Sequence, residues 1–149
     1  MASTFSVHIP FVEMVGFELI GCDAGTSELA ITLREELCNG WSVVHGGVTM
    51  TLLDVVMAHA ARSPNQPGFA DGTGVGVVTV EMKTSFMRPG LGRMVARGVL
   101  LHRTASLAFC EASVFDADGK RTAHATGTFK YMKGLPAGGR KIHRPDASD

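Results

Sequence analysis

Residues 48–61 limit the possible folds of this chain more than any other segment, because they are apolar almost all round a helical wheel. A helix without a wide polar face must be buried rather than lie on a surface. Ser63, Pro64 and Asn65 follow and are typical of a helix end. The sequence therefore predicts one long helix inside the core. Its apolar residues include Leu52, Leu53, Val55, Val56, Met57 and Ala60.

Strands are predicted for most of the remaining chain. In residues 75–87 apolar and polar side chains alternate, so we expect Val80, Met82 and Phe86 on one face and Thr79 on the other. One buried helix with an antiparallel meander implies an α+β domain in which a curved antiparallel sheet wraps the helix. The pattern indicates two strands before the helix and four after it, at residues 17–23, 27–33, 75–87, 93–101, 107–115 and 122–131.

The length of 149 residues favours a single domain. We expect this domain to span residues 1–133, with a short helix at about 9–16, and residues 134–149 to form a flexible tail. The 14 basic and 14 acidic side chains balance, which gives no general attraction for nucleic acid or an anionic membrane. No apolar run is long enough to span a membrane.

The cysteines and histidines indicate neither a disulfide framework nor a metal centre. The three cysteines are odd in number and far apart, and free thiols suit a reducing compartment, so we expect a cytoplasmic protein. His59, His102 and His124 have no metal-ligand spacing with cysteines or carboxylates. We therefore expect no metal and no other cofactor.

Asp54 is the one acidic residue within the apolar helix. An ionised carboxylate in apolar surroundings is costly unless it is paired, hydrogen-bonded or protonated. It could be a structural residue satisfied by Thr51 or Arg62. It could equally be the carboxylate of a general base or a nucleophile, which needs the same kind of environment.

The start of the helix is a second candidate for chemistry. Gly46 and Gly47 would leave backbone N–H groups at the positive end of the helix dipole, open to a developing oxyanion. Paired glycines could also merely allow a tight turn. His45 could bind substrate or cap the helix, and Asn39 could orient a carbonyl or water, or only shape its turn.

Taken together, these residues resemble a known family. The pattern is Asn39-x5-His45-Gly46-Gly47-x6-Asp54, followed by Thr79 and by the run Phe86-Met87-Arg88-Pro89-Gly90. It resembles the hotdog-fold thioesterases of the phenylacetate-pathway type, in the 4-hydroxybenzoyl-CoA thioesterase superfamily. The resemblance covers roughly residues 10–129, nearly the whole expected domain.

The resemblance implies a reaction and roles for these residues. It implies hydrolysis of a small aromatic or short- to medium-chain acyl-CoA, with coenzyme A entering only as part of the substrate. Asp54 would attack the thioester or activate water, and the Gly46 amide would polarise the carbonyl, while Gly47 is expected to bind substrate. Asn39 and His45 would hold the thioester or the water. Thr79 would help to fix the nucleophilic water.

Helix geometry predicts that this site is shared between two chains. Gly46 and Asp54 are eight residues apart, which is about 12 Å along a helix. An Asp side chain cannot span that distance to a carbonyl bound at the start of its own helix. Two antiparallel helices across a two-fold axis could bring each start beside the other's middle, so we expect a homodimer or homotetramer. The resemblance implies the same interface site.

Other assignments are weaker and leave alternatives open. Arg88 and Arg103 could bind the phosphates of coenzyme A, or be ordinary solvated residues, and Trp41 could line the acyl pocket or anchor its loop. A hydratase or dehydratase acting on acyl thioesters, and a non-catalytic acyl-CoA-binding protein of the same fold, are the alternative functions. A hydratase usually relies on a His paired with an acid, but here His45 precedes the helix and Asp54 lies within it, and a pure binding protein would not need this acid. Both observations favour the hydrolase.

Overall fold

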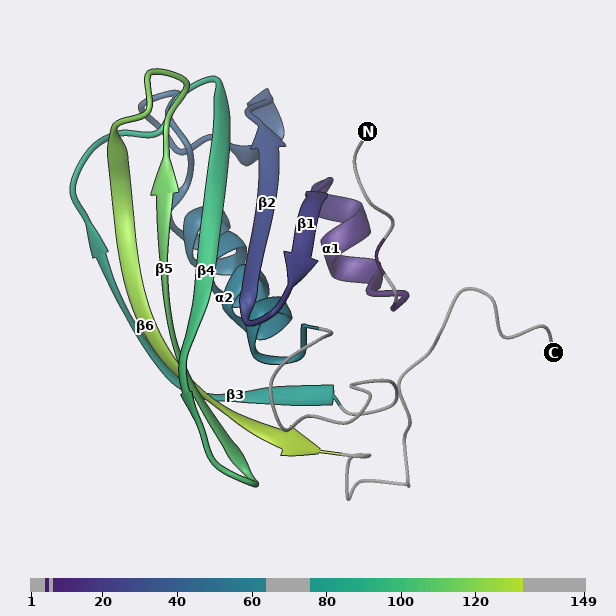
Figure 1. Ribbon diagram of the computed structural model, residues 1–149. Helices are drawn as coiled ribbons and strands as arrows, with labels where there is room; N and C mark the ends of the chain where they lie inside the picture. The colour runs from purple at the N-terminus through teal and green to yellow at the C-terminus, as the bar shows by residue number, and fades with distance from the viewer. Residues whose placement is uncertain (1–4, 6, 64–75, 133–149) are drawn as a thin grey trace, which may run out of the picture.

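The structure is a computed structural model that describes residues 5, 7–63 and 76–132 (Figure 1). The predicted tail at 134–149 and the proposed helix-end residues Pro64 and Asn65 lie outside these residues. In order, the elements are α1 (Pro10–Val15), β1 (Glu18–Asp23), β2 (Thr26–Thr32), η1 (Glu35–Leu37), α2 (Gly46–Ala61), β3 (Gly76–Phe86), β4 (Arg93–Arg103), β5 (Leu107–Phe115) and β6 (Arg121–Met132).

The strands form one antiparallel sheet in the order β1-β2-β4-β5-β6-β3. This sheet curves around α2, while α1 lies beside β1 (Figure 1). The predicted α+β class, with a sheet wrapped around a central helix, is confirmed. In the described part of the chain, no helix is long and apolar enough to cross a membrane.

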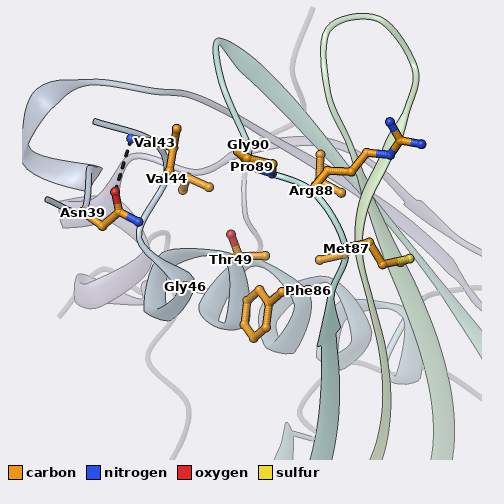
Figure 2. Close-up of a pocket in the computed structure, with 12 residues that line it drawn as sticks. Asn39, Val43, Val44, Gly46, Thr49, Phe86, Met87, Arg88, Pro89 and Gly90 are labelled. Atoms are coloured by element: carbon orange, nitrogen blue, oxygen red, sulfur yellow. Dashed lines mark hydrogen bonds between the residues drawn. The ribbon is translucent and has the colours of Figure 1, made fainter. Parts of the chain in front are cut away.

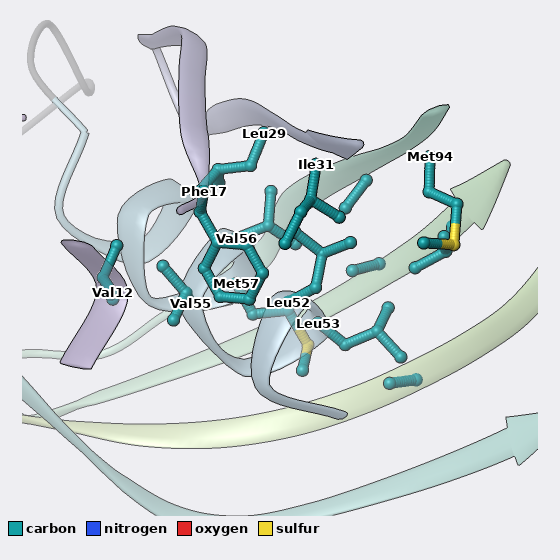
Figure 3. Close-up of a cluster of buried hydrophobic side chains, with 14 of the residues drawn as sticks. Val12, Phe17, Leu29, Ile31, Leu52, Leu53, Val55, Val56, Met57 and Met94 are labelled. Atoms are coloured by element: carbon teal, nitrogen blue, oxygen red, sulfur yellow. The ribbon is translucent and has the colours of Figure 1, made fainter. Parts of the chain in front are cut away.

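The core lies between α2 and the concave face of the sheet (Figure 3). Leu53, Val56 and Met57 on α2 are 0% exposed and pack with Leu29 from β2 and Met94 from β4. Each fully buried side chain of this size contributes about 1.5–3 kcal/mol relative to leaving it in water. The apolar helical segment seen in the sequence is therefore the element against which the sheet packs.

Small residues let α2 approach the sheet closely. A Cβ added at Gly98 of β4 would lie 2.7 Å from the carbonyl oxygen of Val56, so only glycine fits there without movement. Ser27 of β2 donates a hydrogen bond to that same oxygen at 2.9 Å. Backbone carbonyls inside a helix already accept one bond, and this second bond fixes the helix against the strands.

One stripe of α2 is not covered by its own sheet. Gly47, Met50, Thr51, Asp54 and Ala58 are half-buried or exposed, and they repeat every three or four residues on one helical face. Within one chain, this stripe is an exception to the predicted burial of the helix. Its physical reason is that a single sheet can curve around only part of the helix circumference. The stripe contains Asp54, so the uncovered face of α2 is also the face that carries the candidate carboxylate.

Candidate active site

The carboxylate of Asp54 has one hydrogen-bond partner among the described residues, the hydroxyl of Thr79 on β3. Thr79 Oγ1 donates to Asp54 Oδ1 at 2.6 Å. Thr51, which the sequence offered as a structural partner, donates instead to the carbonyl oxygen of Gly47 at 2.8 Å. Thr79 thus contacts the carboxylate directly, and its contact with a nucleophilic water stays a prediction.

A β-bulge brings Thr79 to this position. Thr79 pairs with Phe129 on β6, but Glu81 pairs with Thr128, so Val80 is an extra residue in β3. Such a bulge shifts the alternation of side chains by one residue. The prediction that Thr79 and Met82 lie on opposite faces of β3 is therefore wrong. Both side chains lie on the face toward the helix. Alternation counted along the sequence cannot reveal an inserted residue.

Two opposing effects act on the pKa of Asp54. Burial raises the pKa above the ordinary value of an aspartate, because the charged form loses water, and the hydrogen bond from Thr79 lowers it again. Burial is the larger of the two, so the pKa of Asp54 is raised overall. The carboxylate is more basic than an exposed aspartate and stays within reach of a substrate, which suits a general base or a nucleophile.

A cavity of about 410 Å³ opens at Asp54, and we call it the Asp54 pocket. Most of its walls are apolar, and they come from α1, α2 and β3. The size is in the range of small-molecule binding pockets. It is lined by Ile9, Phe11, Val12, Met50, Thr51, Asp54, Val55, Thr79 and Met82.

The start of α2 is capped by His45. Its Nδ1 accepts a hydrogen bond from the backbone N–H of Gly47 at 2.8 Å. Because Nδ1 is an acceptor, the proton of the neutral ring is on Nε2, which remains available as a donor. The expectation that both glycine amides are free is therefore wrong for Gly47. In the described part of the chain the Gly46 amide forms no hydrogen bond.

Asn39 shapes the loop that leads into the helix. Its Oδ1 accepts a hydrogen bond from the backbone N–H of Trp41 at 2.9 Å. It also accepts one from the backbone N–H of Val43 at 3.4 Å (Figure 2). This matches the turn-shaping alternative for the side-chain oxygen. The side-chain nitrogen takes no part in these bonds, so Asn39 can still donate to a ligand.

A second cavity, of about 350 Å³, lies at the start of α2, and we call it the helix-start pocket (Figure 2). A Cβ added at Gly46 would lie 3.5 Å from the ring of Phe86, so this ring sits directly in front of the helix start. Asp54 does not line the pocket. Its lining residues are Asn39, Val43, Val44, Gly46, Thr49, Phe86, Met87, Arg88, Pro89, Gly90, Thr122 and Ala123.

The predicted site residues thus fall into two groups in one chain. Asp54 and Thr79 line one pocket, while Asn39, Gly46 and Arg88 line the other. Trp41 lines neither pocket, and its side chain is 86% exposed. Arg103 stacks over Tyr131 at 5.8 Å, at the end of the sheet opposite to Arg88.

Sequence reasoning missed several residues of these pockets. Thr49 is 5% exposed and lines the helix-start pocket, and its hydroxyl forms no hydrogen bond with any described residue. The spacing of Thr49 four residues after His45 could have placed it on the same helical face. Phe11 of α1 lines the Asp54 pocket, but a contact between segments so distant in sequence leaves no local signal.

Potential metal ligands do not converge in the described part of the chain. Across residues 5, 7–63 and 76–132, no group of three or more His, Cys, Asp or Glu side chains could hold a metal ion. His124 on β6 contacts Glu111 on β5 at 3.4 Å, and neither residue lines either pocket. The absence of a cofactor remains a prediction.

A sequence model described as the thioesterase superfamily matches residues 42–123, more than half of the chain. This chain belongs to the thioesterase superfamily. The matched segment contains Gly46, Asp54 and Thr79 and ends in β6, so it covers both pockets except for Asn39, Ile9 and the residues of α1. The predicted family and the predicted reaction class, hydrolysis of a thioester, are confirmed by this membership.

Individual relatives are similar over most of their length. A conserved protein from Pseudomonas aeruginosa is 28% identical, with a TM-score of 0.75, and the match covers 85% of this chain and 97% of that one. The PaaI protein of the phenylacetic acid degradation operon of Escherichia coli is 20% identical, with a TM-score of 0.74, over 84% and 86% of the two chains. At that identity the likeness supports the shared hotdog fold alone.

A protein from Saccharolobus solfataricus that carries a provisional esterase name is also similar to this chain. It is 27% identical over 117 residues, which are 78% of this chain and 79% of that protein. The similarity therefore extends through most of the chain rather than through a single motif.

Proposed function

We propose that this thioesterase hydrolyses acyl-CoA without a metal or redox cofactor, with Asp54 as the catalytic carboxylate. The environment of Asp54 carries the proposal. The carboxylate lies in a largely apolar pocket, and burial raises its pKa. Its one hydrogen-bond partner among the described residues is the Thr79 hydroxyl. A structural carboxylate on a helix would be expected to have a cation or several donors around it. Asp54 instead keeps acceptor capacity for a reaction.

Two forms of the reaction use this carboxylate. In the first, ionised Asp54 attacks the carbonyl carbon, the C–S bond breaks, coenzyme A leaves as a thiolate, and water hydrolyses the resulting anhydride. In the second, Asp54 removes a proton from a water molecule that attacks the same carbon directly, and the C–S bond then breaks to release coenzyme A as a thiolate. In both, the carbonyl oxygen becomes negative and needs a donor. The free amide of Gly46, at the positive end of α2, supports the proposal that it is this donor.

We propose that Asp54 and Gly46 act on one substrate from two different chains. The separation of about 12 Å expected from the helix rise agrees with their position in two different pockets of one chain. The uncovered stripe of α2 supports a partner helix at that face. β3 is an edge strand in which Val80 is 57% exposed, and such edges need a partner or protection. A homodimer, or a homotetramer built from such dimers, fits both surfaces.

Further residues take supporting roles in this proposal. His45 Nε2 and the Asn39 side-chain nitrogen are donors near the helix start, suited to hold the thioester. Arg88 lines the same pocket and could bind a phosphate of coenzyme A. The backbone N–H of Gly47 acts indirectly in this proposal, because it donates to His45 Nδ1 and so orients the His45 ring. Trp41 and Arg103 line neither of the two pockets, and their role in substrate binding stays a prediction.

The free thiols are consistent with a cytoplasmic enzyme. Cys22, Cys38 and Cys110 form no disulfide. Burial is the largest cause that raises the pKa of Cys22 to about 11 and that of Cys110 to about 12, so both remain protonated thiols at neutral pH. A reducing compartment is the usual place for a protein with unpaired cysteines.

Release of free thiol from a panel of acyl-CoA esters tests the proposed function. We expect Asp54→Asn to lower kcat by at least about a hundredfold with little change in KM, because the carboxylate acts on the reacting atoms. EDTA should leave the wild-type rate unchanged. Near-normal turnover by Asp54→Asn would remove Asp54 from the mechanism, and a rate lost with EDTA and restored by a divalent ion would contradict the cofactor-free reaction.

A further inference from the structure

The two pockets of one chain differ in the hydrogen-bonding groups that they offer. In the Asp54 pocket both hydroxyl groups are already engaged: Thr51 donates to the Gly47 carbonyl at 2.8 Å, and Thr79 donates to Asp54 at 2.6 Å. The other lining side chains, Asp54 excepted, are aliphatic, aromatic or thioether groups. A ligand in this pocket therefore finds apolar walls and one carboxylate.

The helix-start pocket offers free polar groups. The Thr49 hydroxyl forms no hydrogen bond with a described residue, and Figure 2 shows it directed toward the loop that contains Pro89 and Gly90. The nitrogen of Asn39 and the guanidinium of Arg88 also line this pocket. Amide and phosphate groups, which the coenzyme A arm carries, need such partners when they leave water.

The α1 helix completes the apolar wall at Asp54. Val12 is 2% exposed and anchors α1 in the core, whereas Phe11 is 53% exposed and lines the pocket beside Ile9. Met14 lies on the same helix, is 69% exposed and does not line the pocket. Phe11 can therefore limit the length of a ligand at Asp54 without being required for folding.

We propose that the Asp54 pocket receives the acyl group of the substrate, that this group is apolar, and that Phe11 limits its length. The inference rests on the proposed function, because it places the thioester carbon between Asp54 and the Gly46 of a partner chain. The acyl group would then extend toward α1, and the sulfur and the coenzyme A arm toward the polar helix-start pocket. A hydroxyl group on the acyl chain would lose its bonds to water and find no free donor among the residues that line this pocket in one chain.

Acyl-chain selectivity tests this assignment. We would measure kcat/KM of wild type, Phe11→Ala, Phe11→Leu and the matched control Met14→Ala on butanoyl-, hexanoyl-, octanoyl- and 6-hydroxyhexanoyl-CoA. Wild type should prefer hexanoyl- over 6-hydroxyhexanoyl-CoA by roughly tenfold or more. Phe11→Ala should raise the octanoyl-to-butanoyl ratio by roughly tenfold, Phe11→Leu by less, and Met14→Ala should leave this ratio within about twofold of wild type. Circular dichroism and gel filtration would establish that all four proteins fold and assemble alike.

The outcomes separate this inference from the proposed function. If no acyl-CoA is hydrolysed, or if Asp54→Asn remains active, the proposed function fails and the inference fails with it. If hydrolysis depends on Asp54 but Phe11→Ala leaves the chain-length ratio unchanged, the inference alone is overturned. Equal rates on hexanoyl- and 6-hydroxyhexanoyl-CoA would also overturn it. If Phe11→Ala instead weakens inhibition by free coenzyme A, the pocket binds the coenzyme arm and the assignment is reversed.

Discussion

At the residue scale, the central feature is a carboxylate whose basicity is set by two neighbouring influences of opposite sign. Burial on the open stripe of α2 raises the pKa of Asp54, and the Thr79 hydroxyl lowers it. A carboxylate with a strongly raised pKa would be protonated and inert at neutral pH, and an exposed one would be a weak base. The Thr79 hydroxyl therefore holds the carboxylate in place and favours its ionised form.

The pH dependence of kcat/KM should report this balance. Activity requires ionised Asp54, so it should fall as the pH drops through the pKa of this group, and the acid limb should lie above the range of an ordinary aspartate. Thr79→Val removes the bond that favours the charged form, so the limb should move to higher pH, and Thr79→Ser should move it back. A limb that stays in place or moves to lower pH in Thr79→Val would contradict this role.

The sequence predicted the chemical groups of the site better than their contacts. Asp54 was identifiable because an acid is rare in an apolar helix, and Gly46 because it precedes that helix. The hydrogen bond from Thr79 was not predictable, because it depends on a bulge at Val80 that reverses the faces of half a strand. Likewise, the use of the Gly47 amide by His45 depends on side-chain geometry rather than on residue type.

At the element scale, the fold depends on how closely α2 lies against the sheet. Strand periodicity and helix apolarity are local signals, which is why each predicted strand and the central helix agree with the structure to within a few residues. The short η1 turn and the role of α1 as a pocket wall were missed, because neither has a periodic pattern. The need for glycine at position 98 could not be predicted either, because it arises from the close approach of α2 to β4.

Alanine substitution at two strand glycines tests this close approach. Gly98→Ala would bring a Cβ to 2.7 Å from the Val56 carbonyl oxygen, so we expect a loss of about 1–3 kcal/mol in the free energy of unfolding. The matched control is Gly21→Ala in β1, where nothing lies within 4 Å of the added Cβ. Urea denaturation of both variants provides the measurement. Equal stability of the two proteins would mean that α2 does not press against β4 as described.

At the scale of the whole molecule, the uncovered stripe of α2 and the edge strand β3 are the surfaces on which the proposed two-chain site rests. The core itself contains a further titratable group, His59, which is 4% exposed. Its Nδ1 donates to the Val55 carbonyl oxygen at 2.8 Å, and its Nε2 has no partner in the described part of the chain. Burial, with a contribution from Arg62, lowers the pKa of His59 to about 4.

Acid destabilisation should therefore depend on His59. The pKa of His59 is about 4 in the folded state, below the ordinary histidine value of 6.5, so the unfolded state binds the proton first as the pH falls. Stability should be fully retained above pH 6.5 and should decrease toward pH 4, by up to about 3 kcal/mol from this group. His59→Leu cannot be protonated and should lose less stability over the same range, as measured by urea denaturation at several pH values. An unchanged pH dependence in His59→Leu would refute the assignment.

The shared active site is tested most directly by mixing two inactive variants. Asp54→Ala and Gly46→Val, each inactive alone, would be co-refolded in equal amounts with different tags, and the mixed dimers recovered through both tags. If Asp54 of one chain acts with Gly46 of the other, a mixed dimer holds one site with both lesions and one with neither. About half of the dimers are mixed in random pairing, so the unfractionated mixture should regain about a quarter of wild-type activity. Recovered mixed dimers without activity would contradict the two-chain site.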